Sequence, residues 1–592
     1  MLKESKVSYY DLRLDGKKQG KKVGFIVDND NRDMAEIIGT EIFGGQDICY
    51  YDILNFNTDS IDSLKSDLET NGITEFSYII IWGDSLADKN DSKRCMKSDE
   101  EEYSFNRYMH LILNAIKEKC KSIYVISPFR NSSGNEPERA DRKCNAVLEK
   151  RNSMLKEIAL KEEVSYIDVF EETQNSFTLQ RVDMRASGTQ RLKYLAKRIE
   201  TEILSCRFLT DELSPGGKRL KLSVITVCYN SESTIEQTIK SVISQKNVDV
   251  EYIIVDGCST DKTLQIVDRY KDKIAKVISE PDRGIFDAMN KGISLANGDI
   301  ISFLNSDDWY EPNALYLVEQ VFLRSGADIV VGNSYYISQA GEMVYYNGDK
   351  DTNNDIRVRM PYHHESIFAR REQFKVADNF DLKFKLAADY DWFLRQFLCG
   401  VDIYRIDVPV FTFTYGGASS VNAIECAYEA KMIASNYAAK PEIRSGIDEH
   451  WVNAVAANID SPEITEILKN KKFLRDGLLD KDKVYVWGTG RWAEKTIRLI
   501  EESGVSIFAY IDEDKDKQKS NFYGYKVIDF DNVPVNSEII IATPKYEAEI
   551  RELLIQSGWD TRKIQSVNNL NKVVALQLAR LWPELKVCNN KV

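Results

Sequence analysis

Three stretches of the chain alternate short apolar runs with helical patterns, and this alternation restricts the fold more than any other feature. Apolar runs separated by helical segments are typical of parallel sheets whose strands are joined by helices. In the first stretch, roughly residues 20–205, such runs begin at Val23, Tyr78, Ser122 and Ser165. The pattern recurs from Leu222 to about residue 420, and again from Lys483 onward. We therefore predict an α/β chain with three sheet-containing domains.

The boundaries between these stretches follow from local composition. The segment "DELSPGGKRLK" separates the first two stretches and has the Pro-Gly-Gly punctuation of a linker. A strand-poor stretch then separates the second from the third, and its pattern indicates helices packed beside the central domain. A length of 592 residues fits three or four domains. We expect an N-terminal domain at residues 1–210 and a central domain at residues 218–421. A helical connector at residues 422–480 and a C-terminal domain at residues 481–592 would follow.

Composition excludes several classes of protein. The net charge of −14 argues against general nucleic-acid binding, which needs a basic surface. No run of about 18 apolar residues occurs, so we expect no transmembrane helix. The first residues, "MLKESKVSYYDLRLDGKKQGKK", lack the apolar core of a signal peptide. The 10 cysteines form no Cys-x-x-Cys pair, which favours reduced thiols and a cytoplasmic location.

The stretch "YIIIWGDSLADKND", residues 78–91, contains the Gly-Asp-Ser-Leu signature of a group of esterases. The N-terminal domain weakly resembles a degenerate SGNH hydrolase, a family whose serine follows the first strand and whose histidine lies in a terminal Asp-x-x-His block. Here Ser85 follows a later strand, and the corresponding block at Asp183 has no histidine. The domain's single histidine, His110, lies in a helical pattern. A serine hydroxyl without a neighbouring base is a poor nucleophile, so we interpret Asp84 and Ser85 as a capping turn.

Three apolar runs of the central stretch end in polar residues. "LSVITVCYN", "VEYIIVDGCSTDKT" and "GDIISFLNSDDWYEP" each contain a buried-strand pattern followed by such a tip. Ligands of open α/β sheets bind outside the carboxyl ends of the strands, so we expect these tips to share one crevice. The residues are Thr226, Tyr229 and Asn230; Asp256, Ser259 and Asp261; and Asn305, Ser306, Asp307 and Asp308.

The paired acids at the third tip suit a nucleotide-sugar site. Departure of a nucleoside diphosphate needs a cation to take up its negative charge, and Mg²⁺ or Mn²⁺ binds one or two carboxylates together with substrate phosphates. An Asp-Asp pair alone is more often a solvated turn. Here the neighbouring tips and the segment "SEPDRGIFDAMNKGISLANGD" favour the functional interpretation.

The central stretch resembles a family 2 glycosyltransferase with the GT-A fold. The resemblance rests on "TVCYN", "IIVDGCSTDKT", "EPDRGIFDAMNKGI" and "LNSDD", which occur in the family's order and spacing. Further on, "PYHHESIFARREQF", "NFDLKFKLAADYDWFLR" and "FTYGGASS" are similar to a bacterial surface-polysaccharide subgroup. The resemblance covers about 200 residues.

The resemblance implies a role for each matching residue. The nucleotide base and ribose would contact Thr226 and Asp256, with Tyr229, Asn230 and Ser259 nearby. The diphosphate or sugar would face Asp282, Arg283, Asn290 and Lys291. Asp308 would be the main metal ligand, and Asp307 would contact ribose or metal. Ser306 stands at the first position of the family's Asp-x-Asp motif, so the metal would rest on fewer carboxylates.

The resemblance also implies a catalytic base. Asp389 matches the second acid of the family's Glu-Asp motif, although Ala388 replaces the first, and Asp391 is the alternative. The base would take a proton from the acceptor hydroxyl in one in-line displacement, which inverts the sugar's configuration. His364, and less so His363, could ligate the metal as neutral imidazole, but a packed histidine pair is an equal alternative.

The third stretch opens with "VYVWGTGRWAEKTIRLIEESGVSIFAYIDED", a strand, a glycine turn, a helix and a second strand. Gly488 and Gly490 fit a dinucleotide fingerprint, and Asp512 lies about 20 residues further, where a ribose-binding acid is expected. The segment resembles the small Rossmann-like domain of sialic-acid-type acetyltransferases and nucleotide-sugar enzymes. We expect a ligand-binding module, with a nucleotide as the possible ligand, or a purely structural module rather than a second active site.

Together these patterns predict a cytoplasmic, metal-dependent, inverting glycosyltransferase of bacterial capsule or O-antigen synthesis. The donor would be a nucleotide sugar, with a UDP-sugar favoured, and the acceptor a glycan or lipid-linked oligosaccharide. Peripheral contact with the inner face of the membrane and homo-oligomerisation are compatible with the sequence. Two alternatives stay open: an additional acyl esterase or acyltransferase activity of the N-terminal domain, and a multidomain assembly scaffold.

Overall fold

The structure is a computed structural model, and it describes most of the chain from residue 219 onward. The longer described ranges are 219–337, 356–376, 378–414, 421–458, 483–502 and 505–589. Shorter described segments and single residues are 7–10, 23–27, 48–52, 78–82, 123–126, 153, 155–161, 165–167, 201, 343–346, 416–417 and 464.

The chain divides into two compact units. The first comprises residues 1–352, 361–385 and 392–417, and the second comprises residues 353–360, 386–391 and 418–592. The chain therefore passes between the units within one helix, α14 (Ala388–Cys399). Each unit contains its own hydrophobic core.

A five-stranded parallel sheet lies in the N-terminal part of the first unit. Its strands are β2 (Val23–Val27), β3 (Ile48–Asp52), β4 (Tyr78–Trp82), β5 (Ile123–Ile126) and β6 (Ser165–Ile167). They are ordered β3-β2-β4-β5-β6, and the four apolar runs of the first stretch all contain a strand, as expected. Ser85 and His110 lie outside the described residues, so the interpretation of the Gly-Asp-Ser-Leu stretch stays a prediction.

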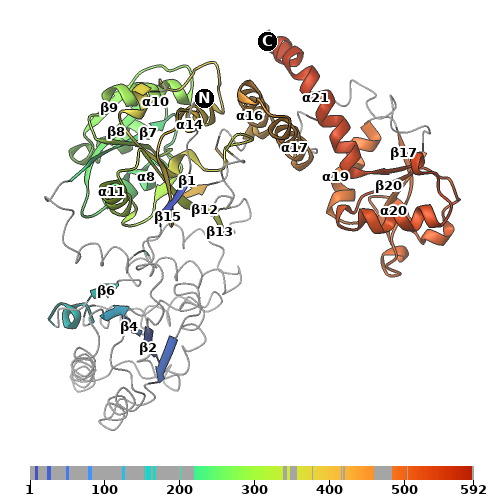
Figure 1. Ribbon diagram of the computed structural model, residues 1–592, viewed down its shortest axis with the longest axis horizontal. Helices are drawn as coiled ribbons and strands as arrows, with labels where there is room; N and C mark the ends of the chain where they lie inside the picture. Colours follow the sequence, from blue (N-terminus) through green and yellow to red (C-terminus); the bar gives the residue numbers. More distant parts are fainter. Residues whose placement is uncertain are drawn as a thin grey trace. The chain divides into compact units, whose positions relative to one another are not determined.

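The central sheet has ten strands and mixed direction (Figure 1). Its main order is β1-β15-β12-β14-β10-β7-β8-β9, with β11 paired to β15 and β13 paired to β12. Strand β14 is antiparallel to both of its neighbours, whereas β7, β8, β9 and β10 run parallel. The strands are β1 (Val7–Tyr10), β7 (Lys221–Cys228), β8 (Asp249–Asp256), β9 (Lys276–Ser279), β10 (Ile300–Phe303), β11 (Trp309–Tyr310), β12 (Ile329–Ile337), β13 (Met343–Tyr346), β14 (Ile367–Arg370) and β15 (Ile403–Thr414).

One segment joins a sheet that its sequence position does not suggest. Strand β1 pairs in parallel with β15 at the edge of the central sheet, although the sequence placed its residues in the N-terminal domain. Edge pairing needs only main-chain groups, so a short strand can add to a sheet far away in sequence.

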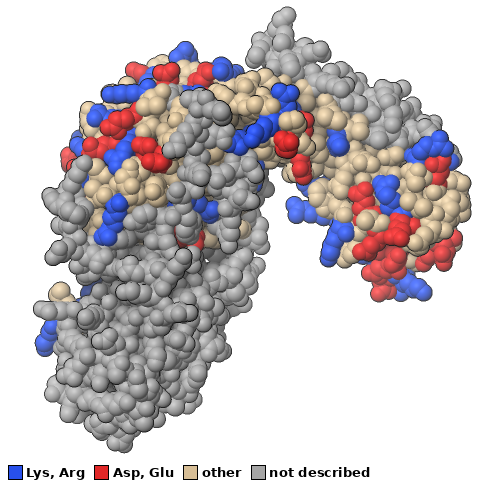
Figure 2. Space-filling view, viewed as in Figure 1, with Lys and Arg blue, Asp and Glu red and all other residues tan. Residues whose placement is uncertain are grey.

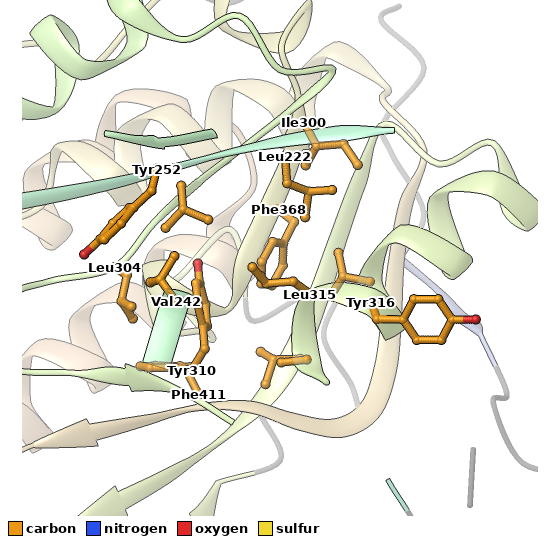
Figure 3. Close-up of a cluster of buried hydrophobic side chains, with 14 of the residues drawn as sticks. Leu222, Val242, Tyr252, Ile300, Leu304, Tyr310, Leu315, Tyr316, Phe368 and Phe411 are labelled. Atoms are coloured by element: carbon orange, nitrogen blue, oxygen red, sulfur yellow. The ribbon is translucent and has the colours of Figure 1, made fainter. Parts of the chain in front are cut away.

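The core of the central domain lies between the sheet and three helices. Residues of β7 alternate between two faces, so Val224 points into this core while Ile225 contacts α10 (Ile285–Leu295) on the other side. Figure 3 shows the core side chains, which include Leu222, Tyr252 and Phe368. The helices that contribute to it are α8 (Ile235–Ile243), α9 (Thr263–Asp268) and α11 (Ala314–Ser325).

The second unit contains a six-stranded sheet in the order β18-β19-β17-β16-β20-β21. All pairs are parallel except β18–β19, and the parallel strands follow the order of the first five strands of a doubly wound sheet. Its strands are β16 (Lys483–Trp487), β17 (Ser506–Ile511), β18 (Asn521–Phe522), β19 (Tyr525–Ile528), β20 (Ile539–Ile541) and β21 (Ile564–Ser566). Its helices are α19 (Arg491–Glu502), α20 (Glu547–Gln556) and α21 (Val567–Asn589).

Helices α16 (Ala423–Tyr437) and α17 (Pro441–Ala457) share the core of this second unit. Trp451 of α17 is 1% exposed and donates an indole hydrogen bond of 2.7 Å to the carbonyl oxygen of Ala575 in α21. The sequence pattern placed these helices beside the central domain. Periodicity shows that a helix has an apolar face, but it does not show which sheet covers that face.

Within the described residues, no helix is long and apolar enough to cross a membrane.

Candidate active site

The carboxyl ends of β7, β8 and β10 meet at one edge of the central sheet. Cys228 at the end of β7 lies opposite Asp256 at the end of β8. On the other side of β7, Phe303 at the end of β10 lies opposite Ile225. The three polar tips expected from the sequence therefore follow three adjacent strands.

Asp256 is fully buried at the centre of this edge. Its carboxylate accepts hydrogen bonds from the Ser259 main-chain nitrogen (3.0 Å) and the Ser279 hydroxyl (2.6 Å). The Cys228 sulfur lies 3.7 Å away, and burial together with the nearby Asp256 charge raises the pKa of that thiol. Asp256 thus holds the loop after β8 in place.

The loops after β7 and β8 are tied to each other. The Asn230 main-chain nitrogen donates to the Ser259 hydroxyl (2.8 Å), and the Asn230 side chain accepts from the Thr260 nitrogen (2.9 Å). Asn230 has a φ of 51°, a left-handed conformation that asparagine tolerates. Tyr229 is 63% exposed at the tip of β7. An exposed aromatic ring on a braced loop offers a flat surface to a planar ligand.

Thr226 is more deeply buried than its predicted place at a strand tip suggested. It is fully buried, and its hydroxyl accepts a hydrogen bond of 3.1 Å from Tyr252 on the next strand. This places the side chain inside the core beneath the strand tips.

The segment before α10 and the helix itself supply charged groups to the same edge. A Cβ atom added to Gly257 would lie 2.5 Å from the Asp282 Oδ2 atom, so this carboxylate sits directly against the loop after β8. Arg283 is exposed and pairs with Asp287 at 3.0 Å. Lys291 donates to the Pro281 carbonyl oxygen at 2.7 Å and is held by nearby acids, which keep its pKa raised despite partial burial.

Asn290 makes hydrogen bonds within the fold. Its amide donates to the Phe380 carbonyl oxygen (2.9 Å) and accepts from the Phe380 nitrogen (3.1 Å). This reciprocal pair ties α10 to the segment before α14. The sequence assigned Asn290 to the diphosphate or sugar, and the structure gives it this bracing contact.

The acidic turn after β10 comprises residues 305–308, and its members differ in exposure. Asp308 is 1% exposed; its Oδ1 atom accepts from the Thr414 nitrogen (2.8 Å), and its carbonyl oxygen accepts from the Thr238 hydroxyl (2.7 Å). Asp307 is only half-buried, and its Oδ2 atom lies 3.4 Å from where a Cβ of Gly417 would be. Of the two acids, Asp307 is the more accessible.

A buried glutamate that the sequence analysis did not single out packs against this turn. Glu365 is 1% exposed and accepts a hydrogen bond of 2.6 Å from the Asn305 side chain. Burial raises the pKa of Glu365 to about 7. Burial, followed by the Glu365 and Asp307 charges, also raises the pKa of Asp308. A glutamate directly after two histidines, in front of an apolar strand, was the signal available in the sequence.

The two histidines occupy different surroundings. The His363 ring stacks between Tyr346 and Phe413, and its Nδ1 atom lies 3.1 Å from the Ser334 hydroxyl. Burial lowers the pKa of His363 to about 4, so the ring is neutral and packed. The His364 Nε2 atom lies 3.3 Å from the Glu365 carboxylate.

Asp389 and Asp391 lie in the first turn of α14, in the part of the helix that belongs to the second unit. Asp391 is 4% exposed. The main-chain nitrogens of Leu386 and Ala387, just before the helix, donate to the buried carboxylate of Glu429 on α16. Glu429 is a further residue that the sequence analysis did not identify.

The glycine turn of the C-terminal domain joins β16 to α19. Gly488 has a φ of 107°, and a Cβ there would lie 2.5 Å from Thr543. The Asp512 carboxylate accepts hydrogen bonds from the Thr489 hydroxyl and from Lys517 (3.0 Å). The expected ribose-binding acid is therefore engaged by the protein's own side chains. Figure 2 shows that acidic side chains gather on the visible face of this domain, which does not favour a polyanionic ligand there.

No cluster of three or more His, Cys, Asp or Glu side chains suited to a metal occurs among the described residues. A cation at the strand tips would therefore need oxygen atoms from its substrate as well as from the protein.

Comparison with known proteins finds sequence similarity over the central and C-terminal regions. Residues 223–377 match the family model of glycosyl transferase family 2, and residues 480–565 match the model described as C2185-like, N-terminal. Chondroitin synthase of Pasteurella multocida is 30% identical over 179 residues, which cover 29% of this chain and 18% of the synthase. A PGL/p-HBAD biosynthesis glycosyltransferase of Mycobacterium bovis is 28% identical over 180 residues, covering 30% of this chain and 69% of that protein.

Among solved structures, S. aureus TarS residues 1–349 with UDP-GlcNAc has a TM-score of 0.33 and 20% identity, covering 42% of this chain and 80% of that one. A mannosyltransferase from Pyrobaculum calidifontis with GDP-Man and Mn²⁺ has a TM-score of 0.32 and 17% identity, covering 52% and 94%. By its sequence, the central region is similar to glycosyltransferases of family 2 over residues 223–377. The matched region spans less than a fifth of the length of the chondroitin synthase.

Proposed function

We propose that the central domain transfers a sugar from a nucleotide-sugar donor, with a UDP-sugar favoured, to a hydroxyl group of a glycan acceptor. The observation that supports this best is the meeting of three polar strand tips around Asp256 beside an acidic turn, within the residues that match the family model. The proposed reaction is a single in-line displacement with inversion at the anomeric carbon.

The donor's nucleoside would lie on the braced loops after β7 and β8. Tyr229 is exposed and could stack on the base, and Asn230 and Ser259 hold the loops together. Thr226 and Asp256 would support the nucleoside from beneath these loops, because both side chains are fully buried. The diphosphate and sugar would lie toward Asp282, Arg283 and Lys291. The cationic side chains of Arg283 and Lys291 offer charge-assisted hydrogen bonds to phosphate oxygens.

A divalent cation fits the acidic turn by the chemistry of its donors. Mg²⁺ or Mn²⁺ needs only one or two protein carboxylates when phosphate oxygens complete its shell. We assign Asp307 as the main ligand, because it is the more accessible acid, with Asp308 behind it. This reverses the order expected from the sequence, and His364 becomes a neighbour of Glu365 rather than a ligand. When bound, the cation would offset negative charge developing on the leaving diphosphate.

The catalytic base is proposed to be Asp389, with Asp391 as the alternative. This assignment rests on the sequence motif. Both acids stand in the first turn of a helix, where the helix dipole favours the ionised carboxylate that a base requires.

The wider setting is also a proposal. The acceptor would be a lipid-linked oligosaccharide of bacterial capsule or O-antigen synthesis, met by peripheral contact at the inner face of the membrane. The C-terminal domain would bind a nucleotide at Gly488 and Gly490 only if that ligand displaces the contacts that Thr489 and Lys517 make with Asp512.

A donor screen tests the proposed function. The full chain is incubated with UDP-, GDP- and dTDP-sugars, with and without Mn²⁺, and release of the nucleoside diphosphate is measured. We expect metal-dependent turnover of one donor class. It should fall by about 100-fold in Asp307→Asn and by a similar factor in Asp389→Asn. No turnover of any donor, or turnover unaffected by Asp307→Asn, would refute the assignment.

A further inference from the structure

Glu365 is almost completely buried just before β14, against the acidic turn that follows β10. A buried carboxyl group costs free energy unless its surroundings compensate for the lost hydration. Neither the sequence motifs nor the proposed mechanism gives this residue a task.

The contacts of Glu365 are with the turn itself. Its Oε1 atom accepts a hydrogen bond of 2.6 Å from the Asn305 amide. Its carboxyl group also interacts with the Asp308 carboxyl group. Among the described residues, no N–H or O–H group donates a hydrogen bond to the buried Asp308 Oδ2 atom.

Other elements hold the rest of the turn. The Thr414 nitrogen donates to Asp308 Oδ1 from the end of β15, and the Thr238 hydroxyl donates to the Asp308 carbonyl oxygen from α8. The Ser306 hydroxyl lies 2.8 Å from the Ser231 hydroxyl in the loop after β7. Asp307 stands between these anchored residues and is the more accessible acid.

We propose that Glu365 is a positioning residue that holds Asn305 and Asp308, and thereby aims Asp307 at the diphosphate and cation of the donor. The inference rests on the proposed function, and it adds a residue that acts from behind the site. Removing Glu365 would leave the Asn305 amide without its acceptor and Asp308 beside an empty space, so the turn would shift. A shift of about 1 Å in a positioned group can lower turnover by up to about 100-fold.

A matched control separates this role from simple stabilisation. Glu319 on α11 is also fully buried, and it accepts hydrogen bonds from the Leu220 nitrogen (2.9 Å) and from Arg219 (3.1 Å). Leu220 precedes β7, so Glu319 lies at the end of the strand opposite the polar tips. Glu319→Ala therefore removes a buried glutamate far from the donor site.

The test compares Glu365→Ala, Glu365→Gln and Glu319→Ala in the full chain. Donor turnover is measured against donor and Mn²⁺ concentration, and binding of Mn²⁺ with UDP is measured by titration calorimetry and by the electron paramagnetic resonance of free Mn²⁺. We expect Glu365→Ala to lower kcat/KM for the donor and the affinity for Mn²⁺–UDP by about tenfold each. Glu365→Gln can still accept from Asn305 and can donate to Asp308, so it should stay within about threefold of wild type.

Several results would overturn the inference. Wild-type affinity for Mn²⁺–UDP in Glu365→Ala would do so, as would equal losses in Glu319→Ala, or a Glu365→Gln variant as impaired as the alanine variant. If Glu365→Ala does not fold, Asn305→Ala removes the same contact from the turn and should show the same weakened binding. Failure of the proposed function is distinguishable, because the wild-type chain would then turn over no donor, while the binding measurements would still judge the role of Glu365.

Discussion

The substitution Gly257→Ala tests whether the loop after β8 forms the donor site. Gly257 follows Asp256, and its nitrogen donates to the Cys228 carbonyl oxygen (2.9 Å). An added Cβ would lie 2.5 Å from Asp282 Oδ2 and 3.5 Å from a ring carbon of Tyr229. Ordinary contact begins at 3.4 Å, so the Asp282 oxygen must move by about 0.9 Å. The Tyr229 ring can stay where it is.

This displacement should affect function far more than stability. Asp282 is only partly buried, so its side chain can rotate away, and the free energy of unfolding should change by less than about 1 kcal/mol. A carboxylate moved by about 1 Å in the site should lower kcat/KM for the donor by about 10- to 100-fold. The assay is diphosphate release from the donor that the wild-type chain uses, with a thermal melt of each variant.

A double-mutant cycle provides the control. Asp282→Ala removes the atoms that the new methyl group would meet, so Gly257→Ala should cause little further loss in the Asp282→Ala background. Additive losses would show that the methyl group acts elsewhere. Wild-type kinetics in Gly257→Ala would show that the Asp282 carboxylate does not contribute to the donor site.

Three further substitutions test the fold around the sites. Glu251 is 4% exposed; burial raises its pKa, but hydrogen bonds outweigh burial and lower the pKa from 4.5 to about 2. Its ionised form therefore stabilises the fold above pH 4.5, and this contribution is lost as the pH falls toward 2. Glu251→Gln should lower the free energy of unfolding in urea by about 3 kcal/mol at pH 7 but by about 1 kcal/mol at pH 3, and equal losses would contradict this. Gly488→Ala imposes a φ of 107° on alanine, and its Cβ would lie 2.5 Å from Thr543. It should therefore destabilise the C-terminal domain by about 2 kcal/mol or more. Gly490→Ala is the control and should not destabilise the domain, because the space around Gly490 is open. Trp451→Phe removes the indole hydrogen bond to a main-chain carbonyl oxygen of α21 and should cost about 1 kcal/mol or more in thermal or urea unfolding. An unchanged midpoint would show that α17 does not depend on this contact.

Much of the central domain was predictable from its sequence, because the information is local. A buried parallel strand appears as an apolar run, and the polar residues that follow it must lie at its carboxyl end. Tyr229, Asp256 and Asp307 were therefore identified as strand-tip residues, and their strands occur as predicted. The parallel pairing of β16 and β17 follows the same logic, since α19 joins the two strands as a helical crossover.

The sequence could not show which side chains of a tip face outward. Thr226 in β7 and Tyr229 directly after it are three residues apart, yet one is fully buried and the other is 63% exposed. Asp307 and Asp308 are adjacent, and their exposures differ because the loop after β10 turns between them. Asn290 was assigned to the donor on the basis of a motif, and the motif gave no sign that its amide meets a main-chain segment 90 residues away.

What the sequence alone determined about this protein is the succession of strands and helices, and the chemical character of each strand's end. Both depend on neighbours along the chain, through periodicity, turn residues and burial pattern. Only the tertiary structure decided that β14 inserts antiparallel between β10 and β12, that Glu365 meets Asn305 and Asp308, and that α16 and α17 share the core of the C-terminal domain. These contacts join residues tens of positions apart, and their free energies depend on packing, which a pattern of apolar and polar residues does not encode.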